Sequence, residues 1–408
     1  MIQRTLFEDL KKEFSKKRIT ALVGARQVGK TTLMKQLFEI VKYESIYLKF
    51  DNIEVLNLFD LNIEAFITQY IRPYTYIFID EIQYSKKSGK YLKYIIDEFE
   101  DKKLFVTGSS TPELSISTLS YLVGRVRIFE VYGISFEEFI NFKDSTKLPL
   151  LKDGSSDSGA MIQFRNLLIE YLMYGSYPAV IGEDDVEEKK IILKDIINTY
   201  LLKEIREILQ YENAYQFELL SKRLSLSDGG ILNYSSISSD VSINSLKVKE
   251  MISILEKTYI LNLVRPHFNN KIKELIKSAK VYFLDTGFKN SLTNNFAEFD
   301  FRVDKGELYE SFILKAMLLE GLKPTFWNFK NEYEVDFVLE KDSKRYGFEV
   351  KSKINSSSIT TSMKKFIDSS SPTMVYILNE NIDAVEEYNG VEIIFTSHLN
   401  IFSILRRI

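Results

Sequence analysis

The feature that most constrains this chain is a glycine-rich segment near the N-terminus, Gly24–Thr31, with the sequence GARQVGKT. It follows an apolar stretch, Ile19–Val23, and precedes an amphipathic stretch, Thr32–Val41. The pattern G-x-x-x-x-G-K-[ST] between a strand and a helix is typical of a loop that binds a polyphosphate through its backbone N–H groups and the helix N-terminus. The segment therefore predicts a nucleotide-binding α/β domain.

The residues of this loop have separate expected roles. Gly24 and Gly29 allow a tight turn and a close approach to the phosphates. Lys30 is expected to reach the β- and γ-phosphates, and the Thr31 hydroxyl is expected to bind Mg²⁺. The predicted nucleotide-binding residues are Gly24, Ala25, Arg26, Gln27, Val28, Gly29, Lys30, Thr31 and Thr32.

Composition narrows the class of protein. The length of 408 residues suggests two or three domains, and the net charge of −3 gives no global sign of nucleic-acid binding. The chain has no cysteine and two histidines, which excludes disulfides and disfavours a Ser-His-Asp triad or a multi-histidine zinc site. We find no run of 18 apolar residues and no signal peptide, so we expect a cytoplasmic protein with no membrane partner.

A second apolar strand, Tyr76–Asp80, ends in two acids, Asp80 and Glu81. This is the form of a Walker B strand, in which Asp80 would hold Mg²⁺ directly or through water. Glu81 would then orient or deprotonate the water that attacks the γ-phosphate. Without the phosphate loop upstream, the same residues would describe a strand that simply ends at polar residues.

Two further candidates follow later strands. Ser109 or Ser110, after Leu104–Thr107, could touch the γ-phosphate, or could belong to a polar turn. Arg125 could sense the γ-phosphate in its own site or act as a finger toward a neighbouring subunit. A structural or merely exposed arginine is an equal alternative.

The chain as a whole is predicted to be α/β: a P-loop NTPase parallel sheet, then a helical and winged-helix region, then a C-terminal PD-(D/E)xK-nuclease-like α/β domain. Short apolar strands alternating with helices indicate the parallel sheet. The predicted domains are 1–145 (ATPase), 146–215 (linker and helices), 216–290 (winged-helix-like) and 291–408 (nuclease-like).

The third segment has the order of a winged helix-turn-helix, with helical stretches followed by two strands, Tyr259–Val264 and Lys280–Leu284. Basic residues gather in and around the predicted wing and the last helix; they are Lys247, Lys249, Arg265, Lys271, Lys273, Lys277 and Lys280. Such a patch could contact DNA phosphates, although a solvated loop with lysines is the alternative.

Near the C-terminus, Asp336 lies in one predicted strand, while Glu349 and Lys351 share one face of the next. A hairpin would bring the three together, so that Asp336 and Glu349 could hold Mg²⁺ while Lys351 positions a water. The pattern resembles the D…(E)-x-K motif of restriction-endonuclease-like nucleases, and Glu310 on the preceding helix resembles their extra acid. Charged and apolar residues also alternate in any half-exposed sheet.

Taken together, the loop, YIFIDEIQ (Tyr76–Gln83), LFVTGSS (Leu104–Ser110) and ISFEEF (Ile134–Phe139) resemble the archaeal and bacterial AAA+-type ATPases that carry a C-terminal domain of unknown function. The resemblance implies that the nucleotide is ATP and that the activity is ATP hydrolysis, but it implies no particular biological task. Further family-typical segments are Gly175–Pro178, Tyr200–Ile205, Phe283–Gly287, Gly306–Phe312 and Glu334–Phe337.

Two functions remain open from the sequence. In the first, an AAA+-type ATPase works with a C-terminal half that binds DNA and cleaves it. In the second, the nucleotide switches a DNA- or protein-binding surface that has no nuclease activity. A homo-oligomer or a protein partner is compatible with both, and a small-molecule kinase is a weaker third reading.

Overall fold

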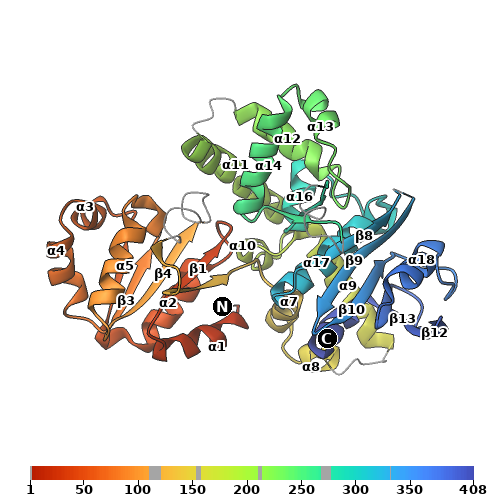
Figure 1. Ribbon diagram of the computed structural model, residues 1–408, viewed down its shortest axis with the longest axis horizontal. Coiled ribbons are helices and arrows are strands. Elements are labelled where there is room, and N and C mark those ends of the chain that lie inside the picture. The colour runs from red at the N-terminus through yellow and green to blue at the C-terminus, as the bar shows by residue number, and fades with distance from the viewer. Residues whose placement is uncertain (1, 110–120, 153–157, 210–213, 268–276, 331) are drawn as a thin grey trace. The chain divides into compact units, whose positions relative to one another are not determined.

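The computed structural model describes the chain except for residues 1, 110–120, 153–157, 210–213, 268–276 and 331 (Figure 1). The chain divides into two compact units, which we describe separately. The first comprises Met1–Ile134, Tyr177–Ala179 and Met251–Ile260, and the second comprises Ser135–Ser176, Val180–Glu250 and Leu261–Ile408.

The first unit is built on a five-stranded sheet with the order β2-β3-β4-β1-β5, in which every pair of neighbours is parallel. The strands are β1 (Ile19–Gly24), β2 (Ser45–Lys49), β3 (Tyr76–Asp80), β4 (Lys103–Ser109) and β5 (Val126–Glu130). Their ends differ from the predicted ones by at most two residues. The predicted parallel sheet is therefore confirmed.

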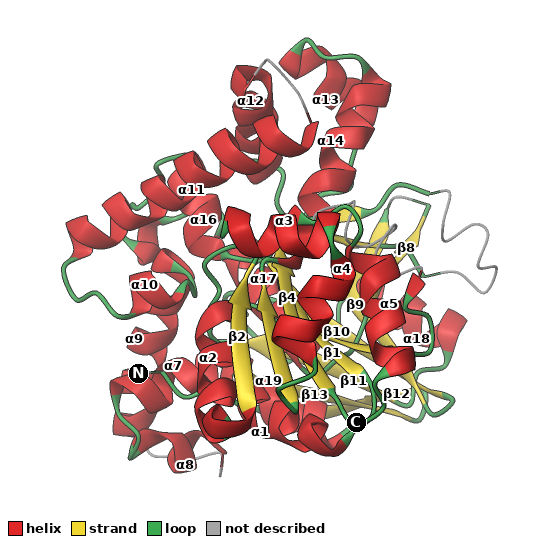
Figure 2. Ribbon diagram, turned by 90° about the vertical axis from the view of Figure 1, so that its left-hand side faces the viewer, coloured by secondary structure: helices red, strands yellow, loops and turns green. Residues whose placement is uncertain are grey.

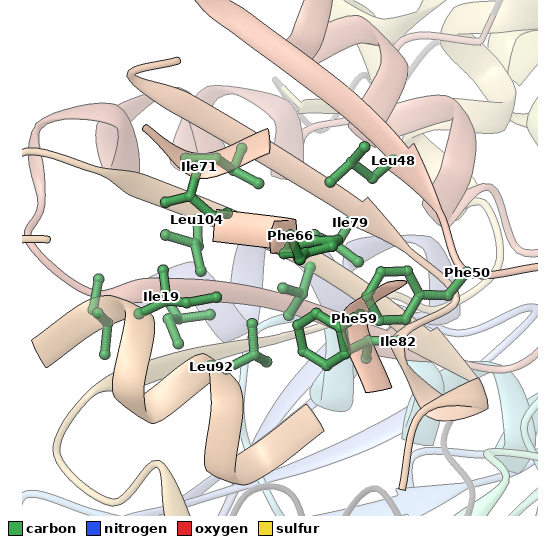
Figure 3. Close-up of a cluster of buried hydrophobic side chains, with 14 of the residues drawn as sticks. Ile19, Leu48, Phe50, Phe59, Phe66, Ile71, Ile79, Ile82, Leu92 and Leu104 are labelled. Atoms are coloured by element: carbon green, nitrogen blue, oxygen red, sulfur yellow. The ribbon is translucent and has the colours of Figure 1, made fainter. Parts of the chain in front are cut away.

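Helices cover both faces of this sheet, which is why its strands are apolar along their length. They are α1 (Leu6–Lys11), α2 (Lys30–Ile40), α3 (Ile53–Leu61), α4 (Ile63–Phe66) and α5 (Ser88–Glu98). On one face, Ile79 and Leu104 of the sheet pack with Phe59, Phe66 and the helix residue Leu92 (Figure 3). This core fixes the strands whose ends carry the predicted nucleotide site.

Several charged residues lie inside the first unit, and Lys103 is one of them. Lys103 is 4 % exposed, and its ammonium donates to the backbone carbonyl of Arg18 (2.5 Å) and to the Thr20 hydroxyl (2.8 Å). Burial lowers the pKa of Lys103 to about 8.

We expect this lysine to make the unfolding free energy depend on pH. Between pH 8 and 10.5 the unfolded chain holds a proton on Lys103 that the folded chain has released, so stability rises with pH in this window. Lys103→Met should remove about 2 kcal/mol of that rise, measured by urea unfolding at pH 7.5 and 10. An identical rise in wild type and variant would show that Lys103 titrates normally.

A helical segment follows in the sequence, with α7 (Phe136–Lys143), α8 (Lys147–Lys152), α9 (Ser158–Tyr174), α10 (Pro178–Ile181) and α11 (Val186–Leu209). The Ser, Asp, Gly and Lys content of 143–159 predicts a linker or exposed loop, and this is wrong for α8. Its leucines favour a helix, and Leu151 is buried.

Next come α12 (Ala214–Ser225), α13 (Tyr234–Val241) and α14 (Ser245–Lys257), followed by β6 (Leu261–Val264) and β7 (Lys280–Phe283). The two strands pair antiparallel. This is the order expected for a winged helix-turn-helix, and that assignment stays a prediction. Lys271 and Lys273 of the predicted basic patch lie outside the described residues.

The second unit contains a six-stranded mixed sheet with the order β12-β13-β11-β10-β9-β8 (Figure 2). Its elements follow α16 (Thr286–Leu292) and run α17 (Lys305–Leu319), β8 (Thr325–Phe329), β9 (Tyr333–Lys341), β10 (Lys344–Val350), α18 (Thr361–Ser370) and β11 (Met374–Asn379). The sequence analysis did not identify α16, nor the last elements, β12 (Ala384–Tyr388), β13 (Val391–Ser397) and α19 (Ile401–Arg407). The order from α17 to β11 is helix-strand-strand-strand-helix-strand, which the resemblance to restriction-endonuclease-like nucleases implies, while nuclease-like ancestry stays a prediction.

Across the described ranges, no helix combines the length and the apolar character that crossing a membrane would need.

Candidate functional site

The phosphate loop joins β1 to α2 and depends on two glycines. A Cβ atom on Gly24 would lie 2.1 Å from the carbonyl oxygen of Val131, so only glycine fits this close approach. Gly29 has φ +100°, which other residues rarely adopt, and it immediately precedes the first turn of α2. The loop therefore has the backbone that the sequence pattern predicts.

Lys30 is held in place by the loop itself. Its side chain is buried, and Nζ donates to the carbonyl oxygens of Gly24 (2.9 Å) and Ala25 (2.6 Å). From this position the ammonium lies at the N-terminus of α2, where the helix dipole already favours an anion. Arg4 steadies the other side of the loop by donating to the carbonyls of Val28 (2.9 Å) and Tyr132 (2.8 Å).

Asp80, at the end of β3, joins three neighbouring elements. Its Oδ1 accepts hydrogen bonds from the hydroxyls of Thr31 (3.3 Å) and Thr107, and its Oδ2 accepts one from the Tyr47 hydroxyl (2.8 Å). Burial, with Asp80 as the next cause, raises the pKa of Tyr47, so this hydroxyl remains a donor. The carboxylate is thus fixed beside Thr31.

Glu81 follows in a left-handed conformation, with φ +60°. Its backbone N–H donates to the Thr107 hydroxyl (3.1 Å), and its carboxylate accepts a hydrogen bond from the Gln83 side chain. A left-handed glutamate is uncommon and is kept in place by its surroundings. Thr107 therefore positions both acids of this strand end.

The remaining candidate residues of the first unit, Ser109 and Arg125, lie at opposite edges of the sheet. Ser109 pairs with Gly24 in the β1–β4 register, which places its backbone beside the phosphate loop, and Ser110 lies outside the described residues. Arg125 lies at the opposite edge, because its carbonyl accepts from Ile19 at the start of β1. Its guanidinium pairs with Asp97 (2.5 Å), so a role toward its own nucleotide is wrong, and a role toward a neighbouring subunit stays a prediction.

Sequence reasoning missed Thr107 and Tyr47. The position of Thr107 at the end of the strand between β1 and β3 was a usable signal, since such strand ends meet at one edge. No comparable signal pointed to Tyr47, because its contact with Asp80 depends on the register of β2 against β3.

We predict that Thr107→Val lowers the rate constant of ATP turnover about tenfold, because a net hydrogen bond to a charged group contributes about 1.5 kcal/mol. Nucleotide affinity should change little, since the loop is intact. Steady-state phosphate release measures both. Thr20→Val, which removes a buried strand hydroxyl at the other edge, is the matched control; equal rates in wild type and Thr107→Val would remove Thr107 from this role.

A second cluster of acids lies on the six-stranded sheet and is called here the carboxylate cluster: Glu310, Glu334, Asp336 and Glu349. The β9–β10 register pairs Phe337 with Phe348, and its continuation by one residue sets Asp336 opposite Glu349 on one face. Asp336 Oδ2 accepts from the backbone N–H of Val350 (2.8 Å), and Lys351 pairs with Glu349 (2.8 Å).

Glu310 comes to the same cluster from α17. Its Oε2 accepts from the Tyr282 hydroxyl (2.7 Å) and lies 3.9 Å from the ammonium of Lys280. The predicted grouping of Asp336, Glu349, Lys351 and Glu310 is therefore a property of the fold, while their catalytic role stays a prediction.

Burial dominates the electrostatics of the cluster. It raises the pKa of Glu349 to about 7 and that of Glu310 well above its usual range, with Asp336 as the next cause for both. Burial opposes the charge on Lys351, but the neighbouring Glu349 and Asp336 carboxylates leave its pKa raised. The cluster thus balances its charge with ammonium groups and bound protons.

One residue of the predicted basic patch lies in this cluster instead of on a wing. Lys280 is 2 % exposed, and its Nζ lies 2.5 Å from Glu334 Oε1 and 3.5 Å from Asp336 Oδ1. The expectation that Lys280 contacts DNA is therefore wrong, since a buried ion pair leaves no free ammonium.

The two sites differ in how well they suit Mg²⁺. Thr31 and Asp80 offer hard oxygens beside a loop that binds phosphates, which fits a cation carried with a nucleotide. In the carboxylate cluster an ammonium already occupies the space among the acids. Over the described part of the chain, no three acidic or histidine side chains are arranged to hold a metal.

A match to a known protein family covers the segment that contains the phosphate loop and Asp80. Residues 16–140 match the family described as an AAA domain. Residues 165–298 and 305–399 match two families described as domains of unknown function (DUF8612 and DUF4143).

Relatives that match most of the chain include two uncharacterized proteins. One from Methanocaldococcus jannaschii is 23 % identical over 84 % of this chain and 76 % of that protein, and one from Haemophilus influenzae is 22 % identical over 79 % and 80 %. Among solved structures, the Walker-type ATPase of Pyrococcus abyssi aligns with a TM-score of 0.43 and 14 % identity, over 72 % of this chain and 96 % of that one. The family match and the phosphate-loop geometry together support an AAA-type P-loop ATPase domain in the N-terminal part of the chain.

Proposed function

We propose that this chain is a Mg²⁺-dependent ATPase whose nucleotide controls a C-terminal half that binds DNA. The observation that carries the ATPase part is the contact of Thr31 with Asp80 (3.3 Å), directly beside Lys30 at the start of α2. These are the side chains that a nucleotide and its metal require, in adjacent positions.

The side chains divide the work. Lys30 would leave the loop carbonyls and pair with the β- and γ-phosphates, while the loop N–H groups bind phosphate oxygens. Thr31 and Asp80 would hold Mg²⁺, which supplies positive charge against the charge that develops on the phosphates. Glu81 would accept a proton from the attacking water, with Gln83 and Thr107 setting its orientation.

We predict that Lys30→Ala loses nucleotide binding and lowers hydrolysis at least ~100-fold, because it removes the charge that faces the phosphates. Glu81→Gln should keep binding and lower hydrolysis by a factor on the order of 100. Binding of a fluorescent ATP analogue and phosphate release separate the two effects. Lys35→Ala, an exposed lysine on α2, is the control; wild-type hydrolysis by Lys30→Ala would refute the proposal.

Two features of the C-terminal half support DNA binding. The order α12, α13, α14, β6, β7 is that of a winged helix-turn-helix, and exposed Lys249 and Lys277 lie on and beside these elements. A net charge of −3 means that any such surface is local.

The C-terminal half has two candidate functions: the first is to bind DNA and cleave it, and the second is to act as a nucleotide-switched binding module without nuclease activity. The observation that favours the second candidate is Lys280 among the carboxylates that a nuclease would use for a metal. In this form, ATP would regulate how the C-terminal half contacts DNA or a protein.

A cleavage assay distinguishes the candidates. Supercoiled plasmid is incubated with the full chain and Mg²⁺ or Mn²⁺, with and without ATP. The second candidate predicts nicking no greater than that of Asp336→Ala or Lys351→Ala, together with ATP-dependent DNA binding in a mobility-shift assay. Nicking that both substitutions abolish would establish the nuclease instead.

A further inference from the structure

The ammonium of Lys280 is surrounded by three carboxylates and an aromatic ring. Its Nζ lies 2.5 Å from Glu334, 3.5 Å from Asp336 and 3.9 Å from Glu310, and 5.6 Å from the centre of the Phe326 ring. The side chain is 3 % exposed. The lysine comes from β7, which is not a strand of the six-stranded sheet that supplies Glu334 and Asp336.

A divalent cation would need the same oxygens. Mg²⁺ takes about six oxygen ligands at short distance, and a dication bound to Asp336 would face the ammonium across a few ångströms. Like charges at that distance repel strongly in a buried site.

The other oxygens of the cluster are largely engaged. Asp336 Oδ2 accepts from Val350, Glu310 Oε2 accepts from Tyr282, and Glu349 Oε1 pairs with Lys351. Glu349 Oε2 is buried without a hydrogen-bond partner among the described residues. While Lys280 pairs with Glu334 and Asp336, this one oxygen does not make a site for a metal ion; without Lys280, Glu334 Oε1 and Asp336 Oδ1 would also lose their ammonium partner.

We propose that Lys280 is a built-in counter-ion that takes the place of the divalent cation in the carboxylate cluster. The ammonium joins β7 to β9 and α17, and the centre is closed to Mg²⁺ and Mn²⁺. The cluster is then an ionic link within the second unit, and phosphodiester cleavage at this centre is not expected. The inference does not depend on ATP hydrolysis by the first unit.

The test is a titration with MnCl₂ on the nucleotide-free full chain, followed by the electron paramagnetic resonance signal of free Mn²⁺. All proteins carry Asp80→Asn, which removes from the titration the carboxylate that lies beside the phosphate loop. With Lys280 present, no saturable binding is expected from the carboxylate cluster. Lys280→Met keeps the apolar stem and removes the charge. This variant should bind one equivalent of Mn²⁺, at least ~tenfold more tightly than any binding by the protein that keeps Lys280.

Two further variants assign the new site. Adding Asp336→Asn to Lys280→Met should abolish the gained binding. Lys103→Met, which removes a buried lysine bonded to a carbonyl and a hydroxyl, is the matched control and should gain none. If Lys280→Met alone gives no cooperative melting transition, Lys280→Met with Glu310→Gln removes one buried acid and should show the same gain.

Either of two results would overturn the inference. One is saturable Mn²⁺ binding with Lys280 present that Asp336→Asn abolishes. The other is a folded Lys280→Met protein, or its Glu310→Gln partner, that binds no additional Mn²⁺. Both can occur while Lys30-dependent ATP hydrolysis stands, so failure here is distinct from failure of the proposed function.

Discussion

The hydrogen bonds to the Asp80 carboxylate are the interaction on which the first unit's chemistry depends. They tie the end of β3 to Thr31 after β1, to Tyr47 on β2 and to Thr107 on β4. Parallel strands bring these residues to one edge, since all their carboxyl ends meet there. The buried core beneath holds that edge in register, so a small displacement of one strand would misplace Thr31 against Asp80.

The second unit is organised around buried charge. Carboxylates from β9, β10 and α17 converge, and a low-dielectric interior does not tolerate several bare negative charges. Lys280 and Lys351 supply part of the compensation, and raised pKa values of Glu310 and Glu349 supply the rest through bound protons. The same compensation that stabilises the cluster removes the space in which a catalytic cation would act.

The two centres differ in whether a ligand can replace their internal contacts. The first has hydrogen bonds, such as those from Lys30 to the loop carbonyls, that contacts to a nucleotide could replace. The second satisfies its charges internally, and its elements include β7 of the winged-helix-like segment. Under the proposed function, the first centre would bind and hydrolyse the nucleotide, while the second would link elements of the C-terminal half.

Sequence patterns alone predict the phosphate loop, the Asp80-Glu81 strand end, the parallel sheet and several elements of the C-terminal sheet. Periodicity and loop chemistry are local, so residues a few positions apart suffice to predict them. The positions of Arg125 and Lys280 depend on contacts between segments that are far apart in the sequence. Arg125 lies at the edge of the sheet opposite the phosphate loop, because β5 begins beside the start of β1. Lys280 lies in the carboxylate cluster and not on the predicted wing, because β7 places it among acids 30 to 69 positions further along the chain. No local sequence pattern encodes such a pairing of charges.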